Sequence, residues 1–416
     1  MPDAKKKILM ISDHALSTSG VGVQSRHLIN GLIEKGEWTV RQLGAAIKHA
    51  DYNVVQVNPD FIIKPIDGFG NRDMMRMLLA QEKPDVLFIF TDPRFFIWLF
   101  EMEDEVHQVC PIVWWHVWDN YPIPKYNYPL YESTDAINCH SHLTYKMCSE
   151  GFPEKTRFIP HALPTEIYFP LPDEEIQRQR RAVLGADRED HFVAFWINRN
   201  AKRKRPNDLL AAWARFLELL EEKHGHRKAT LLMHTDPLDR EGPNLFVTTE
   251  NLGIINNVYF SRDRLQFEQI NVLHNLADIY TNISFAEGFG LGTLEAMQCG
   301  VPIVCTKTGG MTRQVVDHRD GSEHGIGLEI ELQTIVGSQQ VPYIYEDYVS
   351  IETIAQAYLT MYEMGPEARK ALGQKARDYV LSEFTLQKTI DDWHDSLNET
   401  LTRFHSGKPR WTCETL

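Results

Sequence analysis

The stretch from Phe285 to Gly310, FAEGFGLGTLEAMQCGVPIVCTKTGG, constrains the fold and the chemistry of this chain more than any other. A glycine turn opens it, and a segment of helical pattern follows. Gly300, with Pro302 two residues later, predicts the end of that helix. The apolar residues Ile303, Val304 and Cys305 then predict a short buried strand. A glycine turn between a strand and a helix is common in α/β domains.

Two carboxylates flank this glycine turn, at Glu287 and, eight positions later, at Glu295. Amides of a glycine-rich turn can approach an anion closely, and a helix that begins just beyond adds its positive dipole end. Two glutamates at this spacing also occur by chance, but structure alone does not require a carboxylate at each end of the turn. The combination predicts a pocket for a nucleotide sugar, with glycines for phosphate and carboxylates for sugar hydroxyls.

The string EGFGLGTLEAMQCGVPIV resembles the E-x7-E signature of retaining glycosyltransferases of family 4. That resemblance implies the GT-B fold, an α/β fold of two Rossmann-like, doubly wound domains that face each other across a cleft. It implies that Glu287 contacts the transferred sugar and that Glu295 holds the ribose of the nucleotide. The donor implied is a UDP- or GDP-sugar, with no further cofactor. Donor contacts from the turn are expected at Gly288, Phe289, Gly290, Leu291, Gly292 and Thr293.

A basic run, NRNAKRKRP, follows the predicted strand at 191–197 and places five cations between Arg199 and Arg205. By itself such a run is typical of a solvated loop. Near a diphosphate, fixed cations would stabilise the charge that develops on the leaving group. The family resemblance assigns Arg199 to the family's arginine and, in the register of Asp208, Arg205 to its lysine. Whether Lys202, Lys204 or Arg205 contacts the diphosphate stays open.

The segment IVWWHV at 112–117 predicts a buried strand that ends near His116, Trp118 and Asp119. A histidine at this end of a strand could contact a sugar hydroxyl, and the family often has one here. We therefore treat His116 as a catalytic candidate and Trp118 and Asp119 as acceptor-binding candidates. The alternative is a buried structural histidine among tryptophans. No metal site is predicted, because His140 and His142 lack further ligands.

The segment KILMIS at 7–12 predicts a strand, and a glycine-bearing loop and a helix follow it. Strand, loop and helix form the opening unit of a doubly wound domain, whose ligands bind at the carboxyl end of the strand. The GVG in the loop is only a partial match to a dinucleotide fingerprint. The resemblance makes Gly20 and Gly22 candidates for contact with the donor.

The chain of 416 residues is long enough for two domains. We predict an N-terminal acceptor domain at 1–170, a polar linker with a surface helix at 171–190, and a donor domain at 191–384. The resemblance adds a last helix, about 385–404, that crosses back onto the first domain. The segment 318–341 is expected to be irregular.

Composition excludes several classes of protein. The formal net charge of −14 disfavours an extended nucleic-acid track. The six cysteines form no C-x-x-C pair and lie mostly in apolar runs, which predicts buried free thiols. No signal-peptide pattern and no apolar run of spanning length is present, so a cytoplasmic protein without a membrane span is expected. The oligomeric state stays open.

The sequence thus predicts a retaining glycosyltransferase that moves a sugar from a nucleotide-diphosphate donor to an acceptor hydroxyl. A glycan or a small molecule is the preferred acceptor. The alternatives are transfer to hydroxymethylated bases of DNA, as in phage enzymes, and a non-catalytic module that binds nucleotide sugars. The sequence does not identify the donor sugar, its base or the acceptor.

Overall fold

The computed structural model describes residues 4–407, which divide into two compact units. The first unit takes in the chain up to Trp118, Pro122–His161 and the chain from Leu386 on. The second unit takes in Asp119–Tyr121 and Ala162–Thr385. The three residues 119–121 therefore belong with the second unit, although the chain on both sides of them belongs with the first.

The first unit is built on an eight-stranded sheet with the order β3-β4-β2-β1-β5-β6-β7-β8. β3 and β4 pair antiparallel, and the other neighbours pair in parallel. The strands are β1 (Lys6–Asp13), β2 (Trp38–Ala45), β3 (Val55–Asn58), β4 (Phe61–Pro65), β5 (Val86–Thr91), β6 (Ile112–His116), β7 (Ala136–Cys139) and β8 (Thr156–Phe158). The helices are α1 (Gly20–Glu34), α2 (Arg72–Glu82), η1 (Pro93–Phe95), α3 (Ile97–Phe100), α4 (Glu103–His107), η2 (Lys125–Asn127), α5 (Tyr128–Ser133), α6 (His142–Gly151), η3 (Pro153–Lys155) and α15 (Leu386–Ser406).

The second unit is built on a six-stranded parallel sheet with the order β11-β10-β9-β12-β13-β14 and carries a separate hairpin, β15–β16. The strands are β9 (Phe192–Ile197), β10 (Ala229–His234), β11 (Val258–Ser261), β12 (Ile279–Asn282), β13 (Ile303–Thr306), β14 (Gly325–Leu328), β15 (Leu332–Val336) and β16 (Ile344–Tyr348). The helices are α7 (Asp173–Leu184), η4 (Lys202–Lys204), α8 (Pro206–His224), α9 (Leu245–Asn251), η5 (Ile255–Asn257), α10 (Phe267–Asn275), α11 (Leu291–Gln298), η6 (Gly309–Met311), α12 (Thr312–Val315), α13 (Ile351–Glu363) and α14 (Pro366–Glu383).

Apolar runs in the sequence become the central strands of both sheets. β5 is buried along its whole length, and β9 along all but its last residue, as expected for parallel strands covered on both faces. In the second unit, α8 begins at Pro206, and Gly225 caps its C-terminus with the left-handed φ of +74° that suits a glycine. Two Rossmann-like α/β units are present, as the sequence predicts.

The cysteines within the described residues are free and buried, as predicted, at Cys110, Cys139, Cys148, Cys299 and Cys305. The sixth, Cys413, lies outside the described residues. Burial raises the pKa of the Cys110 thiol to about 12, so this side chain behaves as a small apolar group.

The sequence prediction is wrong for the segment 318–341, which is not irregular throughout. Part of it forms β14, which pairs with β13, and part forms the first strand of the β15–β16 hairpin. At Gly325 an added Cβ would lie 1.7 Å from the carbonyl oxygen of Ile303, so only glycine allows the two strands to approach. Gly325 is therefore required for the pairing of β13 and β14 and does not mark a loop.

The predicted linker at 171–190 contains α7, which is attached to the second unit. Arg180 Nη2 donates to Asp278 at 2.9 Å, and Arg180 Nε donates to the carbonyl of Leu276 at 2.9 Å. The chain enters the second unit at Ala162, ahead of the predicted boundary at residue 170. The predicted surface helix is present as α7, but its attachment could not be predicted, because the partners of Arg180 lie about a hundred residues away in the sequence.

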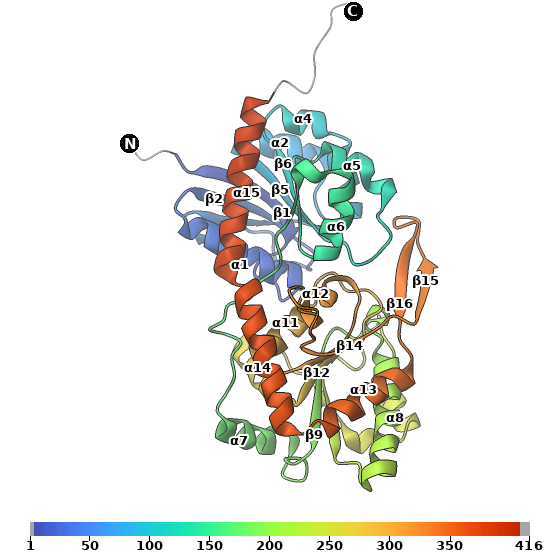
Figure 1. The fold of residues 1–416 in the computed structure, drawn as a ribbon. Helices are drawn as coiled ribbons and strands as arrows, with labels where there is room; N and C mark the ends of the chain where they lie inside the picture. Colours follow the sequence, from blue (N-terminus) through green and yellow to red (C-terminus); the bar gives the residue numbers. More distant parts are fainter. Residues whose placement is uncertain (1–3, 408–416) are drawn as a thin grey trace, which may run out of the picture. The chain divides into compact units, whose positions relative to one another are not determined.

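The last helix, α15, lies beside α1 in the first unit (Figure 1). An added Cβ at Gly31 of α1 would lie 2.1 Å from Ile390 Cδ1, so the glycine permits this close approach. Trp393 of α15 is fully buried, and its ring lies 4.8 Å from Phe88 and 5.1 Å from Trp115. α15 therefore completes the hydrophobic core of the first unit.

Trp393→Ala should lower the free energy of unfolding of the first unit by about 3–5 kcal/mol, because it leaves a cavity among aromatic rings. Urea denaturation monitored by circular dichroism measures this change. Asp395→Ala, an exposed position on the same helix, is the control and should change stability by less than about 0.5 kcal/mol. Equal stability of the two variants would contradict this role of α15.

No helix within residues 4–407 is both long enough and apolar enough to cross a membrane.

Candidate functional site

Glu287 lies in the second unit, in the loop that leads from β12 to α11. Only 8% of its surface is exposed. Lys204 Nζ forms an ion pair with its Oε2, and Arg203 Nη1 lies 3.5 Å from the same oxygen. Ser284 Oγ is also 3.5 Å from Oε2. A buried carboxylate thus meets two cations where β12 ends, which is the ligand-binding edge of a parallel sheet.

Lys204 is buried at the end of the short helix η4. Burial lowers the pKa of its ammonium group, and the neighbouring Arg203 lowers it further, while the Glu287 carboxylate opposes both effects. Lys204 therefore releases its proton at lower pH than a free lysine does. In such a site a fixed cation can stabilise negative charge that develops on a bound group.

Glycines shape the turn around Glu287. Gly290 takes a left-handed φ of +89° immediately before α11. Gly309 takes a φ of +50°, and an added Cβ there would lie 1.8 Å from the Glu287 carbonyl oxygen. The amide of Gly310 donates to that carbonyl at 3.0 Å. The loop after β13 therefore packs on the glycine turn and fixes it, and the Gly310 amide is engaged within the protein.

Glu295 lies one turn into α11, and two buried side chains hold its carboxylate. His274 Nε2 is 3.0 Å from Glu295 Oε2, and the Tyr168 hydroxyl also hydrogen-bonds to the carboxylate. Burial raises the pKa of the Tyr168 phenol, and the Glu295 charge raises it further, so Tyr168 stays a neutral donor. Glu295 is therefore fixed in position near the same edge of the sheet.

The basic run places Lys204, rather than Arg205, against Glu287. Arg205 adopts a left-handed φ of +53° and caps α8. Its Nε donates to Asp208 at 2.8 Å and its Nη2 donates to the carbonyl of Val349 at 3.1 Å. The prediction for Arg205 came from the register of Asp208 in the family resemblance, but the left-handed backbone at Arg205 directs its side chain to Asp208 and Val349.

Arg199 and Lys202 take other positions. The Arg199 side chain is 59% exposed, and its guanidinium group pairs with Asp239 at 2.7 Å and with Glu241 at 3.0 Å. Lys202 borders a cavity of about 370 Å³ that also reaches Phe285. The structure thus brings one of the three candidate diphosphate contacts, Lys204, to Glu287.

His116 is fully buried in the first unit. Its Nε2 lies 2.8 Å from the Tyr131 hydroxyl, and its ring lies 4.1 Å from that of Trp114. These contacts correct the expectation that His116 faces a ligand, and they favour the alternative of a structural histidine. Trp118 is 4% exposed and likewise packs in the interior. β6, which carries His116, is buried along its whole length, as the sequence predicts.

Asp119 lies with the second unit, 3.7 Å from Arg203 Nη1. It therefore shares this guanidinium group with Glu287. Gly20 and Gly22 form the first turn of α1 in the first unit, where the Gly22 amide donates to Ser19 Oγ at 3.0 Å. The structure thus brings Asp119 into the contacts around Glu287, whereas Gly20 and Gly22 belong to the first unit and their contact with a donor stays a prediction.

Several residues around the site were not predicted from the sequence. Arg203 lies inside the basic run, but nothing distinguished it from its neighbours. His274 and Tyr168 contact Glu295 from 21 and 127 positions away, with no recognisable motif. Long-range packing brings them together, so only the tertiary structure identifies them.

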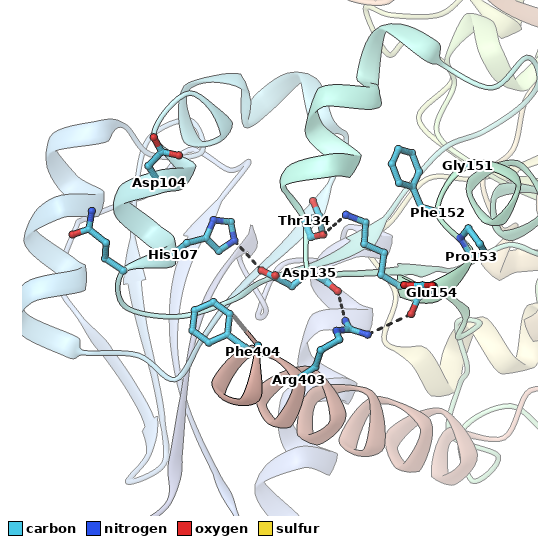
Figure 2. Close-up of a pocket in the computed structure, with 13 residues that line it drawn as sticks. Asp104, His107, Thr134, Asp135, Gly151, Phe152, Pro153, Glu154, Arg403 and Phe404 are labelled. Atoms are coloured by element: carbon cyan, nitrogen blue, oxygen red, sulfur yellow. Dashed lines mark hydrogen bonds and ion pairs between the residues drawn. The ribbon is translucent and has the colours of Figure 1, made fainter. Parts of the chain in front are cut away.

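A second cavity, of about 790 Å³, lies in the first unit beside the end of α15 (Figure 2). Figure 2 shows His107 directed at Asp135, with 2.8 Å between Nε2 and Oδ2, and Arg403 donating to the backbone of Asp135 and Glu154. Lys155 donates to the carbonyl of Thr134 at 2.8 Å. These polar groups bond to one another and to the backbone. Its lining consists of Asp104, His107, Gln108, Thr134, Asp135, Gly151, Phe152, Pro153, Glu154, Lys155, Arg403, Phe404 and Gly407.

The fold matches solved glycosyltransferase structures along almost the whole chain. Sucrose-phosphate synthase from Thermosynechococcus elongatus superposes with a TM-score of 0.72 at 16% identity, over 96% of this chain and all of that one. HepE from Anabaena in complex with UDP-glucose gives 0.65 at 16% identity, over 95% of this chain and 99% of that one. At this identity the likeness defines the fold, which is the predicted GT-B class.

Residues 177–325 match the family model "Glycosyl transferases group 1". Over this range the second unit is similar to a group 1 glycosyltransferase domain, which agrees with the predicted glycosyltransferase class. Both Glu287 and Glu295 lie within the matched range. A D-inositol 3-phosphate glycosyltransferase from Corynebacterium jeikeium is 32% identical over 182 residues, which are 42% of this chain and 41% of that protein. The chain thus spans less than half the length of this curated relative.

Proposed function

We propose that this protein is a retaining glycosyltransferase that transfers a sugar from a nucleotide-diphosphate sugar to an acceptor hydroxyl. The observation that carries the proposal is the buried contact of Glu287 with Lys204 and Arg203 at the end of β12, inside the matched domain. Carboxylate and cations at one point suit a ligand that carries both sugar hydroxyls and a diphosphate.

In this proposal the donor binds to the second unit. Glu295, fixed by His274 and Tyr168, accepts hydrogen bonds from the ribose hydroxyls. The backbone of Gly288–Thr293 and the first turn of α11 face the diphosphate, since helix N-termini favour anions. The solved HepE complex from Anabaena contains UDP-glucose, which supports UDP as the nucleotide here.

The transfer breaks the bond between the anomeric carbon and the diphosphate oxygen, and its electron pair stays on the leaving phosphate. Lys204 and Arg203 stabilise that negative charge, which makes a metal ion unnecessary in this scheme. The acceptor hydroxyl attacks the anomeric carbon from the same face and gives its proton to the departing phosphate oxygen. Glu287 holds the sugar hydroxyls in the orientation that this attack requires.

A small molecule or a glycan is the acceptor that we favour. The name of the relative from Corynebacterium jeikeium gives a small phosphorylated polyol, D-inositol 3-phosphate, as its substrate. The formal net charge of −14 disfavours DNA, the alternative acceptor.

Incubation of the protein with a panel of UDP- and GDP-sugars should release free nucleotide with one preferred donor, and faster once an acceptor is added. Nucleotide release and mass spectrometry of the product measure this result. Hydroxymethylated DNA belongs in the acceptor panel, together with polyols, sugar phosphates and oligosaccharides. Tight UDP binding without any turnover would instead identify a non-catalytic nucleotide-sugar-binding module.

A further inference from the structure

The β15–β16 hairpin of the second unit lies outside the family match at 177–325. It forms a separate two-stranded sheet (Figure 1). Its first strand exposes Leu332 and Ile335, at 58% and 67%. A two-stranded hairpin with little core of its own is marginal in water, so its position depends on the contacts that it makes with the rest of the unit.

Those contacts converge on Asp347, which is 2% exposed. Its Oδ2 accepts hydrogen bonds from Asn120 Nδ2 at 2.8 Å and from Thr308 Oγ1 at 2.6 Å. Its Oδ1 accepts from Gln333 Nε2 at 2.7 Å, and its amide donates to the carbonyl of Phe285 at 2.9 Å. The carboxylate thus joins Asn120, Thr308 and Gln333, and the backbone amide adds a bond to Phe285.

The second strand of the hairpin also fixes the segment 119–121. Asn120 Nδ2 donates to the carbonyl of Tyr345 at 3.1 Å, and the Tyr345 amide donates to the carbonyl of Tyr121 at 2.8 Å. Asn120 is itself 2% exposed. These bonds explain why three residues flanked by the first unit belong with the second.

Two paths lead from Asp347 to Glu287. The first runs through Asn120 to its neighbour Asp119, which shares Arg203 with Glu287 at 3.7 and 3.5 Å. The second runs through Thr308, two residues before Gly310, whose amide donates to the Glu287 carbonyl. Loss of the Asp347 carboxylate would therefore loosen both Arg203, which contacts the Glu287 side chain, and Gly310, which holds the Glu287 backbone.

We propose that Asp347 is a positioning residue, through which the β15–β16 hairpin holds Asp119, Arg203 and the loop after β13 in the geometry that Glu287 needs for sugar transfer. The proposal rests on the function proposed above. Asp347 acts through other residues and has no contact with substrate in this scheme. The hairpin is thus an added device that makes the Glu287 site rigid.

Asp347→Ala should lower kcat for nucleotide release from the preferred donor by about 10- to 100-fold, because small displacements of reacting groups reduce reaction rates by factors of this size. The Kd of UDP, measured by calorimetry, should change less than about threefold, since Glu295 and its partners are untouched. Asp347→Asn keeps an acceptor oxygen for Asn120 and Thr308 and should retain more activity. Ile335→Ser, exposed on the same hairpin, is the control and should match the parent protein.

A double-mutant cycle identifies the path. If Asp347 acts through Asn120, the kcat losses of Asp347→Ala and Asn120→Ala should be far from additive. Additive losses would overturn that path and leave the one through Thr308, which Thr308→Val tests in the same way. Unchanged kcat in Asp347→Ala, or equal losses in Asp347→Ala and Ile335→Ser, would overturn the proposal.

Hydrogen exchange separates this proposal from the proposed function. Peptides that cover 119–121 and 308–310 should exchange faster in Asp347→Ala than in Ile335→Ser. This readout needs no turnover. If the parent protein is inactive on every donor, the transferase function is refuted, but hydrogen exchange still tests whether the hairpin holds 119–121 and 308–310 in place. If exchange is unchanged in Asp347→Ala, that role of the hairpin is refuted even in an active enzyme.

Discussion

Glu287→Gln should lower the rate of sugar transfer by on the order of 100- to 1000-fold while UDP binding persists, the range observed when one preorganised group in an active site is removed. The carboxylate is the group that both Lys204 and Arg203 contact, and it lies where β12 delivers the chain to the ligand-binding edge of the sheet. Steady-state nucleotide release gives the rate, and calorimetry gives the UDP affinity.

Glutamine is preferred to alanine for this test because of Lys204. Either substitution removes the charge that pairs with the buried ammonium group, but alanine would also leave a cavity and no hydrogen-bond acceptor for Lys204. Glutamine keeps the volume and a hydrogen-bond acceptor. Glu323→Gln is the matched control, since Glu323 pairs with Lys307 at 2.7 Å in the same unit and should leave transfer unchanged. Transfer at the parent rate in Glu287→Gln would refute the assignment of the site.

The alkaline limb of the pH–rate profile should report on Lys204. Burial lowers the pKa of this lysine in the free protein. Its cation, and with it the stabilisation of the leaving phosphate, is therefore present at low pH and lost as the pH rises through that lowered pKa. We expect kcat/KM, which reports on the free enzyme, to fall at a pH below the usual range of lysine. The limb of kcat should lie at higher pH, because a bound diphosphate favours the charged lysine.

Lys204→Arg keeps the cation and should move the alkaline limb to higher pH, since arginine does not titrate in this range. Lys204→Met removes the cation and should lower kcat/KM by about 100-fold. Its pH–rate profile should lack the fall at alkaline pH that the titration of Lys204 causes. Lys202→Met, on the same short helix but without a contact to Glu287, is the control. An identical pH profile in Lys204→Arg and the parent protein would show that another group titrates.

Much of the fold could be predicted from the sequence, because its signals are local. The continuous apolar runs of β5 and β9 are typical of buried parallel strands, and Pro206 and Gly225 mark the ends of α8. Prediction failed at Gly325, which suggested a loop but lies in β14 and allows that strand to pair with β13. The surface helix α7 was predicted, but its attachment to the second unit was not, because Arg180 finds its partner Asp278 far along the chain. These are long-range requirements that no local pattern expresses.

The candidate site divides in the same way. The sequence by itself determined that a carboxylate, a glycine turn and a basic run meet at strand ends of one α/β domain, because turn chemistry and parallel topology depend on neighbouring residues. Only the tertiary structure decided which cation reaches Glu287, because the left-handed residue at position 205 redirects the chain and gives the contact to Lys204. It also buried His116 beside Tyr131 and brought Asp347 to Asn120, since packing between distant segments sets both contacts.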